Sequence, residues 1–172
     1  MKNIYSFILY ISIFLVIQLS LNTDNCFSQW QYQPISASGT PYDMKFFDTN
    51  TGIISFNSPG LYRTTNGGIN WNIILPNQIA FLFDKIDMNT VYAAASTSNA
   101  YGMLLRTFNK GLTWDSFQVG NSWTANGLSF INKDTGWICG TSGGNHYIWK
   151  TINSGVNFTV QKTGIGFGYI NF

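Results

Sequence analysis

An eight-residue pattern recurs three times in this chain, as TTNGGINW from residue 64, TFNKGLTW from residue 107 and TINSGVNF from residue 151. The copies start 43 and 44 residues apart and share the form Thr-x-Asn-x-Gly-x-(Asn/Thr)-(Trp/Phe). Self-similarity at a fixed period of roughly 40–50 residues is typical of repeat proteins, and at this length it favours the blades of a propeller. We call each copy a repeat box and number the copies 1 to 3.

Every residue type in the repeat box suits a turn between two strands. The asparagine can accept hydrogen bonds from backbone amides two or three residues further on, and the glycine can take a positive φ without steric cost. The threonine hydroxyl can hold the first arm of the hairpin. The aromatic residue starts the next strand and would bury about 150–250 Å² if it packed inward, so we predict three equivalent buried rings. The predicted structural motif residues are Thr64, Asn66, Gly68, Trp71, Thr107, Asn109, Gly111, Trp114, Thr151, Asn153, Gly155 and Phe158.

Each box lies in a longer unit that reads as four short strands. An apolar run precedes each box and ends in a polar turn, at residues 42–52, 81–90 and 127–136, and a second and a third strand lead from there into the box. A fourth short strand follows the box. The sequence therefore predicts an all-β fold of β-propeller repeats, with about three four-stranded antiparallel blades. The expected blades cover residues 42–75, 79–118 and 123–161.

The two edges of this repeat region resemble parts of further blades. Residues 30–36 (WQYQPIS) read like a strand that closes the last blade, and residues 164–172 read like the first strand of a fourth unit. A closed propeller needs about four to eight blades, so three units predict an incomplete propeller within residues 29–172. We expect a piece of a longer protein, and the alternative is an arc that associates with copies of itself.

The first 28 residues form a separate segment. Lys2 is followed by an apolar run over residues 4–21, which predicts a helical secretory signal peptide at residues 1–28 with cleavage after Ser28. An uncleaved membrane anchor is the alternative, because the run is just long enough to span a bilayer. A lipoprotein cysteine at Cys26 is a weaker alternative, since the residues before it are polar. The expected location is secreted or associated with the cell envelope, and cleavage would leave Cys139 without a disulfide partner.

The repeat box resembles the Asp-box, or BNR repeat, which occurs in sialidases, sortilins, xyloglucan-cleaving hydrolases and the photosystem II stability/assembly factor (Ycf48-like) family. The acidic position of that motif is asparagine in all three boxes here. The Arg-Thr pair at residues 63–64 with the box after it, and the segment 134–137, look most like the assembly-factor branch. The resemblance implies a propeller that serves as a scaffold for another protein.

The acidic and basic side chains give little support to an enzymatic function. The chain has no glutamate, and its two arginines, Arg63 and Arg106, occupy equivalent positions before boxes 1 and 2. Glycoside hydrolysis needs a pair of carboxylates, whereas Asp48, Asp87 and Asp134 fall in the same turn of successive units. We therefore predict no catalytic, cofactor-binding or metal-binding residue.

Four further features have simpler structural readings. His146 is the only histidine and follows a glycine-rich stretch at residues 141–145, where we expect a surface loop. Cys139 is expected to be a small core residue. The aromatic residues Tyr62, Tyr101, Trp123 and Tyr147 could form a platform for a sugar or a peptide, but packing between blades is the more ordinary role for each of them.

The functional prediction is a secreted, non-enzymatic β-propeller repeat protein that acts as a binding or assembly scaffold. The expected partner is another protein or an extracellular glycan. Nucleic acid is not expected, because the net charge is only +2 and is spread along the chain. A membrane would be contacted only through the N-terminal segment if it stays uncleaved. The alternative is a fragment of a secreted glycoside hydrolase or carbohydrate-binding propeller whose catalytic residues lie outside this chain.

Overall fold

The computed structural model describes residues 32–35, 37–57, 60–97, 99, 101–121 and 123–164, and for Trp123 the backbone alone. Contacts divide the chain into two units, residues 1–32 and 33–172, and all the described strands belong to the second unit. The predicted signal peptide lies outside the described residues. Across the part of the chain that is described, no helix is long and apolar enough to cross a membrane.

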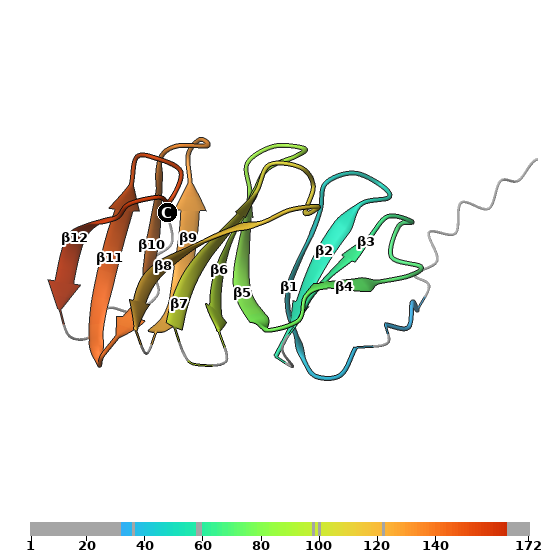
Figure 1. Cartoon of the computed structure of the whole chain (residues 1–172), viewed down its shortest axis with the longest axis horizontal. Helices are drawn as coiled ribbons and strands as arrows, with labels where there is room; N and C mark the ends of the chain where they lie inside the picture. The colour runs from blue at the N-terminus through green and yellow to red at the C-terminus, as the bar shows by residue number, and fades with distance from the viewer. Residues whose placement is uncertain are drawn as a thin grey trace, which may run out of the picture. The chain divides into compact units, whose positions relative to one another are not determined.

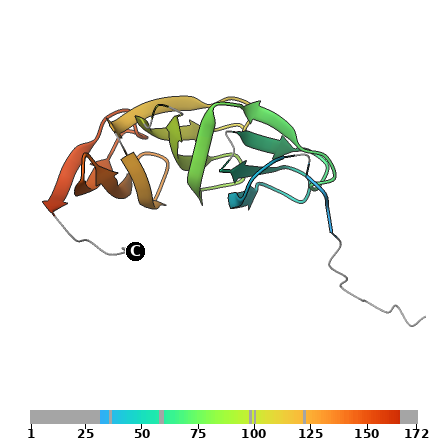
Figure 2. The same cartoon turned by 90° about the horizontal axis from the view of Figure 1, so that it is seen from below.

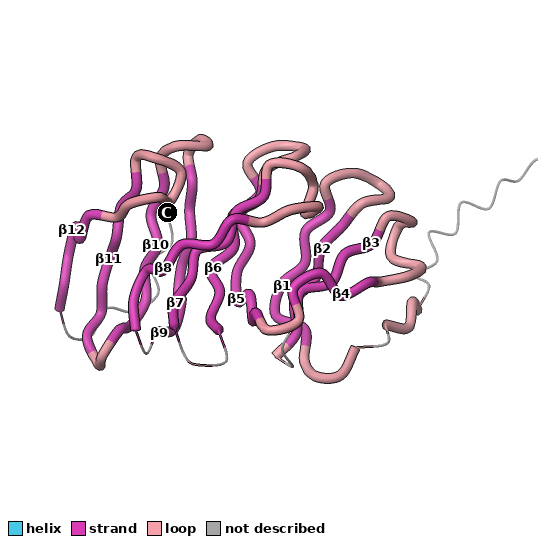
Figure 3. The backbone as a smooth tube through the Cα atoms, viewed as in Figure 1, coloured by secondary structure: helices cyan, strands magenta, loops and turns pink. Residues whose placement is uncertain are grey.

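In the described residues, twelve strands form three four-stranded sheets, and within each sheet consecutive strands pair antiparallel (Figures 1 and 3). Blade 1 contains β1 (Pro41–Phe46), β2 (Gly52–Phe56), β3 (Leu61–Thr64) and β4 (Asn72–Leu75). Blade 2 contains β5 (Gln78–Lys85), β6 (Val91–Thr97), β7 (Tyr101–Thr107) and β8 (Asp115–Asn121). Blade 3 contains β9 (Trp123–Phe130), β10 (Gly136–Ser142), β11 (Asn145–Thr151) and β12 (Thr159–Gly164). The predicted fold class, three four-stranded antiparallel blades of an incomplete propeller, is confirmed.

The turn between the first two strands of each blade is built around one polar side chain. Oδ1 of Asp48 accepts hydrogen bonds from the amides of Asn50 and Thr51, at 2.9 and 2.7 Å. Asp87 and Asn132 make the same pair of bonds in the next two blades. The sequence prediction placed Asp134 in this turn beside Asp48 and Asp87. It does lie in the turn, but the equivalent of the two aspartates is Asn132.

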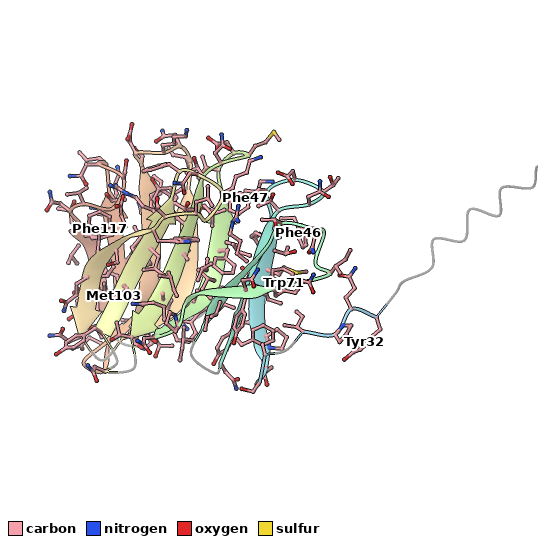
Figure 4. All side chains as sticks on the ribbon, turned by 45° about the vertical axis from the view of Figure 1, so that its right-hand side comes forward. Tyr32, Phe46, Phe47, Trp71, Met103 and Phe117 are labelled. Carbon is pink, nitrogen blue, oxygen red and sulfur yellow. The ribbon has the colours of Figure 1, made fainter. Side chains whose placement is uncertain are left out.

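The blades follow one another along the chain, and two apolar cores lie between them (Figure 2). Strand β6 shows why the middle blade packs on both sides. Successive side chains of a strand point to opposite faces; Ala93 and Ala95 belong to the core shared with blade 1, whereas Tyr92 and Ala94 belong to the core shared with blade 3. Figure 4 shows the side chains that fill these spaces, with Phe47 and Met103 labelled at the first core.

The predictions for the two edges of the repeat region have different outcomes. The described part of the 30–36 segment, residues 32–35, forms no strand. Pro34 lacks an N–H and cannot donate to a sheet there, and blade 1 already has four strands of its own. Gly164 is the last residue of β12, and the remainder of the predicted fourth unit lies outside the described residues.

Candidate functional site

The repeat box forms one hydrogen-bonded turn in all three blades. In box 2 the Thr107 hydroxyl donates to Oδ1 of Asn109 at 3.0 Å and accepts from the amides of Asn109 and Gly111, at 3.3 and 2.9 Å. Boxes 1 and 3 have the same three bonds. The threonine is buried in each case. Its hydroxyl therefore replaces water for main-chain groups that the turn takes out of solvent.

The asparagine of the box reaches further than predicted. Oδ1 of Asn109 accepts from the amide of Thr113, four residues on, at 2.9 Å, and boxes 1 and 3 repeat this bond. The prediction of two or three residues was too short because two successive residues adopt positive φ and widen the loop. They are Lys110 (56°) and Gly111 (76°) in box 2. The glycine accepts this conformation at no steric cost, as predicted.

The three aromatic rings occupy equivalent positions but are only partly buried, which corrects the prediction of buried rings. Trp114 packs against the first core and Phe158 against the second. The ring of Trp114 lies beside the glycine of its own box, where a Cβ on Gly111 would be 3.7 Å away.

The arginines before boxes 1 and 2 each join their blade to the next one. Arg63 Nε donates to the carbonyl oxygen of Lys110 in box 2, and Arg106 Nη1 donates to the carbonyl oxygen of Ser154 in box 3, each at 2.7 Å. Both acceptors are left-handed residues. Lys150, the third cation, lies over the Trp137 ring, with its nitrogen 5.1 Å from the ring centroid. The sequence reveals the three cations beside the boxes, but it does not reveal that the two arginines donate to carbonyls of the next blade.

The six described carboxylates all serve the fold, since each accepts from a main-chain amide, a hydroxyl or a cation. They are Asp43, Asp48, Asp84, Asp87, Asp115 and Asp134. Lys110 of blade 2 reaches back to Asp48 at 2.8 Å and, with two turn amides, holds the pKa of that carboxyl well below its usual range. Burial raises the pKa of Asp84, against the opposing effects of its hydrogen bond from Phe130 N and of the Lys45 charge.

The other candidates from the sequence are dispersed. His146 is not in a loop but in β11, paired with Thr141, because the turn is formed by residues 143–144. Cys139 is buried in β10 as expected, and burial raises its pKa. In the described residues no group of three or more histidines, cysteines or carboxylates could hold a metal ion.

Among the described side chains, the aromatic residues considered as a platform show no ring contact with one another. Tyr62 makes an edge contact with Phe56, and Tyr147 stacks on Trp149 with centroids 4.9 Å apart. Tyr101 is exposed at the start of β7. The side chain of Trp123 lies outside the described atoms.

One end of the blades carries a series of exposed apolar side chains. In each blade the box is hydrogen-bonded to the turn between the first two strands, as in the bond from Gly67 N to Asn50 O at 2.8 Å, so both turns lie at the same end of the sheet (Figure 1). The residue after the box glycine is Ile69, Leu112 or Val156, with 66%, 67% and 49% of its surface exposed. We call these three side chains the box rim. Contiguous exposed apolar patches are typical of interaction surfaces, whereas single exposed apolar residues are common on any protein surface.

No protein-family model matches the chain, and no curated protein is significantly similar to it in sequence. Solved structures do match. They include a structure described as YCF48 bound to D1 peptide (TM-score 0.58, 15% identity, 78% of this chain and 43% of that one) and YCF48 from Cyanidioschyzon merolae (0.60, 14%, 77% and 43%). A GH74 enzyme of Niastella koreensis also matches (0.65, 17%, 77% and 24%). The chain thus shares the fold of these proteins and spans less than half the length of each.

Proposed function

We propose that this chain is a non-enzymatic part of a β-propeller and that it binds or helps to assemble another protein through the box rim. The observation that carries the proposal is the recurrence of an exposed aliphatic side chain at the same box position in all three blades: Ile69, Leu112 and Val156. Folding does not require these positions to be apolar, because their side chains lie largely in solvent. A partner that covers all three would gain roughly 25 cal/mol for each Å² of apolar surface removed from water.

The state of the carboxylates supports a scaffold over a hydrolase. A glycosidase needs one carboxyl group that can give up a proton and a second that can act as base or nucleophile. Here Asp48 and Asp87 are held as carboxylates by lysines and turn amides, and their pKa values are well below the usual range. Asp84 has a raised pKa, but its side chain accepts a hydrogen bond from the Phe130 amide in the next blade. These contacts favour structural roles for these three carboxylates.

The similar structures support both classes of function. One is a complex of YCF48 with a peptide, which is an example of this fold holding a protein segment. Others are GH74 enzymes, which favours the alternative that the chain is part of a glycoside hydrolase whose catalytic groups lie in other blades. Binding and hydrolysis can be separated by experiment.

The direct test selects peptides from a random display library on the full chain and measures their affinity for a variant with serine at Ile69, Leu112 and Val156. A matched control carries serine at Ile73 and Val160, which are exposed apolar residues on outer strands. We expect the rim variant to lose about tenfold or more in affinity, as when contact residues of an interface are truncated, and the control to lose little. Equal binding by both variants would contradict the role of the rim.

A parallel incubation with xyloglucan tests whether this chain is non-enzymatic by itself. Release of reducing ends in proportion to the amount of chain, abolished by an asparagine at any one of the six aspartates, would contradict the non-enzymatic assignment. We also propose that the chain is exported and cleaved after Ser28. Mass spectrometry of the mature N-terminus tests this, and a chain that retains residues 1–28 would contradict it.

A further inference from the structure

The outer face of blade 3 is the face that points away from blade 2. It carries residues equivalent to those by which blade 1 contacts blade 2 and blade 2 contacts blade 3. Register identifies the equivalent pairs across the second and third strands, which are Ile53 with Arg63, Tyr92 with Arg106, and Trp137 with Lys150. The first two pairs lie against the next blade. Ile53 and Tyr92 are fully buried there, and each arginine donates to a carbonyl of the next box. Trp137 is only partly buried.

A second series of equivalent residues lies in or against a core in blades 1 and 2 but is exposed in blade 3. Phe47, Ile86 and Ile131 each follow the first strand of a blade and donate their amide to the threonine carbonyl four residues on. Phe47 is 2% exposed within the first core, and Ile86 packs against the second core. Ile131 is 68% exposed. Blade 3 therefore retains the apolar and cationic groups of a blade-receiving face without a described blade against it.

Blade 1 has the complementary face. Phe83 of blade 2 and Met44 of blade 1 occupy equivalent positions, because Phe83 pairs with Ala93 and Met44 pairs with Ile54. Phe83 is buried in the first core, whereas Met44 is 48% exposed. The box of blade 1 also differs from the other two. The nearest atoms to a Cβ at Gly68 would belong to the Gln33 side chain and to the tryptophan of the same box, whereas at the glycines of boxes 2 and 3 they include side chains of the preceding blade. Among the described residues, no group donates to the Gly67 carbonyl.

The charges favour one pairing of these two faces. At the first junction Lys110 pairs with Asp48, and at the second Lys133 pairs with Asp87, each at 2.8–2.9 Å. Blade 3 has Asn132 in place of the acid. Blade 1 has Gly67 and Thr49 at the two lysine positions, both without charge. Contact between blade 3 and blade 1 of another copy would thus leave neither an acid nor a lysine unpaired at these positions, where burying an unpaired charge would be costly.

We infer that the outer face of blade 3 is a docking surface for blade 1 of a second copy of this chain. Lys150 would donate to the Gly67 carbonyl of the other copy, as the two arginines do at the internal junctions, and Trp137 and Ile131 would be covered. The contact is heterologous, with different faces on the two copies. Two such contacts between two copies join six blades, within the roughly four to eight of closed propellers.

Sedimentation of the full chain over a wide range of concentration tests this inference. Met44→Glu and Ile131→Glu alter one face each, at exposed positions where folding should survive. Val160→Glu is the matched control, because Val160 pairs with Trp149, whose side chain packs toward blade 2 on the opposite face. We expect the unaltered chain and the control to dimerise, and each face variant alone to weaken association by about tenfold or more.

Mixing the two face variants separates this contact from any other self-association. A Met44→Glu copy keeps an intact blade 3 face, and an Ile131→Glu copy keeps an intact blade 1 face, so one contact can form between them. The mixture should therefore associate more tightly than either variant does with itself. A monomeric unaltered chain, face variants that dimerise like the control, or a mixture that stays monomeric would each overturn the inference. Binding of peptides to the box rim is measured separately and does not depend on this outcome.

Discussion

The threonine of the middle box gives the sharpest test of how the blades are stabilised. Thr107→Val keeps the shape of the side chain and adds apolar surface, but it removes the hydroxyl that accepts from the amides of Gly111 and Asn109. Thr107→Ser removes a methyl group and keeps the hydroxyl. A ranking by hydrophobicity would favour valine at this buried site, whereas the hydrogen bonds favour serine.

The expected magnitudes follow from the burial of the two amides. The Gly111 amide is buried, and a buried donor without a partner costs about 1–3 kcal/mol. The Asn109 bond is longer and partly accessible to water, so its loss adds less than about 1 kcal/mol. We expect Thr107→Val to lower the free energy of unfolding by about 2–3 kcal/mol. For Thr107→Ser we expect about 1 kcal/mol, the value of one buried carbon group.

Urea denaturation at neutral pH measures both variants. With a slope of about 2 kcal/mol/M for a domain of this size, valine should lower the midpoint by about 1 M and serine by about half of that. Both slopes should match the unaltered chain. A valine variant as stable as the serine variant, or more stable, would refute the assignment of the hydroxyl as the essential group of the box.

Three further predictions concern the junctions, the turns and the rings. Arg106→Met should lower the free energy of unfolding by about 1.5–3 kcal/mol because a charged hydrogen bond is lost. Lys150→Met, the equivalent change in blade 3, should lower it by under about 0.5 kcal/mol in the monomer. Equal urea midpoints for the two variants would contradict this prediction. The pKa of Asp87 is lowered by a turn amide and by a lysine of the next blade, so its carboxylate stabilises the fold above pH about 4, and this contribution is lost as the pH falls. Asp87→Asn should flatten the fall in urea midpoint between neutral and acidic pH, and an unchanged slope would argue against the assignment. Trp114→Ala should cost about 2 kcal/mol in the same assay, less than a fully buried ring, and a cost near zero would show that the ring does not pack on the core.

The repeat made the fold class predictable from sequence alone. The spacing of Thr64, Thr107 and Thr151 defined the blades, and the glycine of each box indicated a positive φ that the structure has. Local chemistry determines these features, because a turn of this kind is closed by residues within one box. Burial of Cys139 was predictable from its apolar strand in the same way.

Contacts between blades were beyond the reach of the sequence. Nothing local indicates that Arg63 and Arg106 donate to carbonyls in the following blade, since donor and acceptor are nearly fifty residues apart and meet only when the sheets pack. The partial exposure of Trp114 depends on the same packing. The left-handed conformation of Lys110 was missed because a non-glycine residue at that position carries no sequence signal for positive φ.

Native-state hydrogen exchange of the box glycines tests most directly whether the repeat box is a folding element. The amides of Gly111 and Gly155 each donate to a buried threonine hydroxyl at 2.9 Å. If the box is a folding element, both amides should exchange as slowly as those of the central strand β6, through global unfolding. Rapid exchange of both amides while β6 stays protected would show that the box is a loose surface loop, and would contradict its role as a folding element.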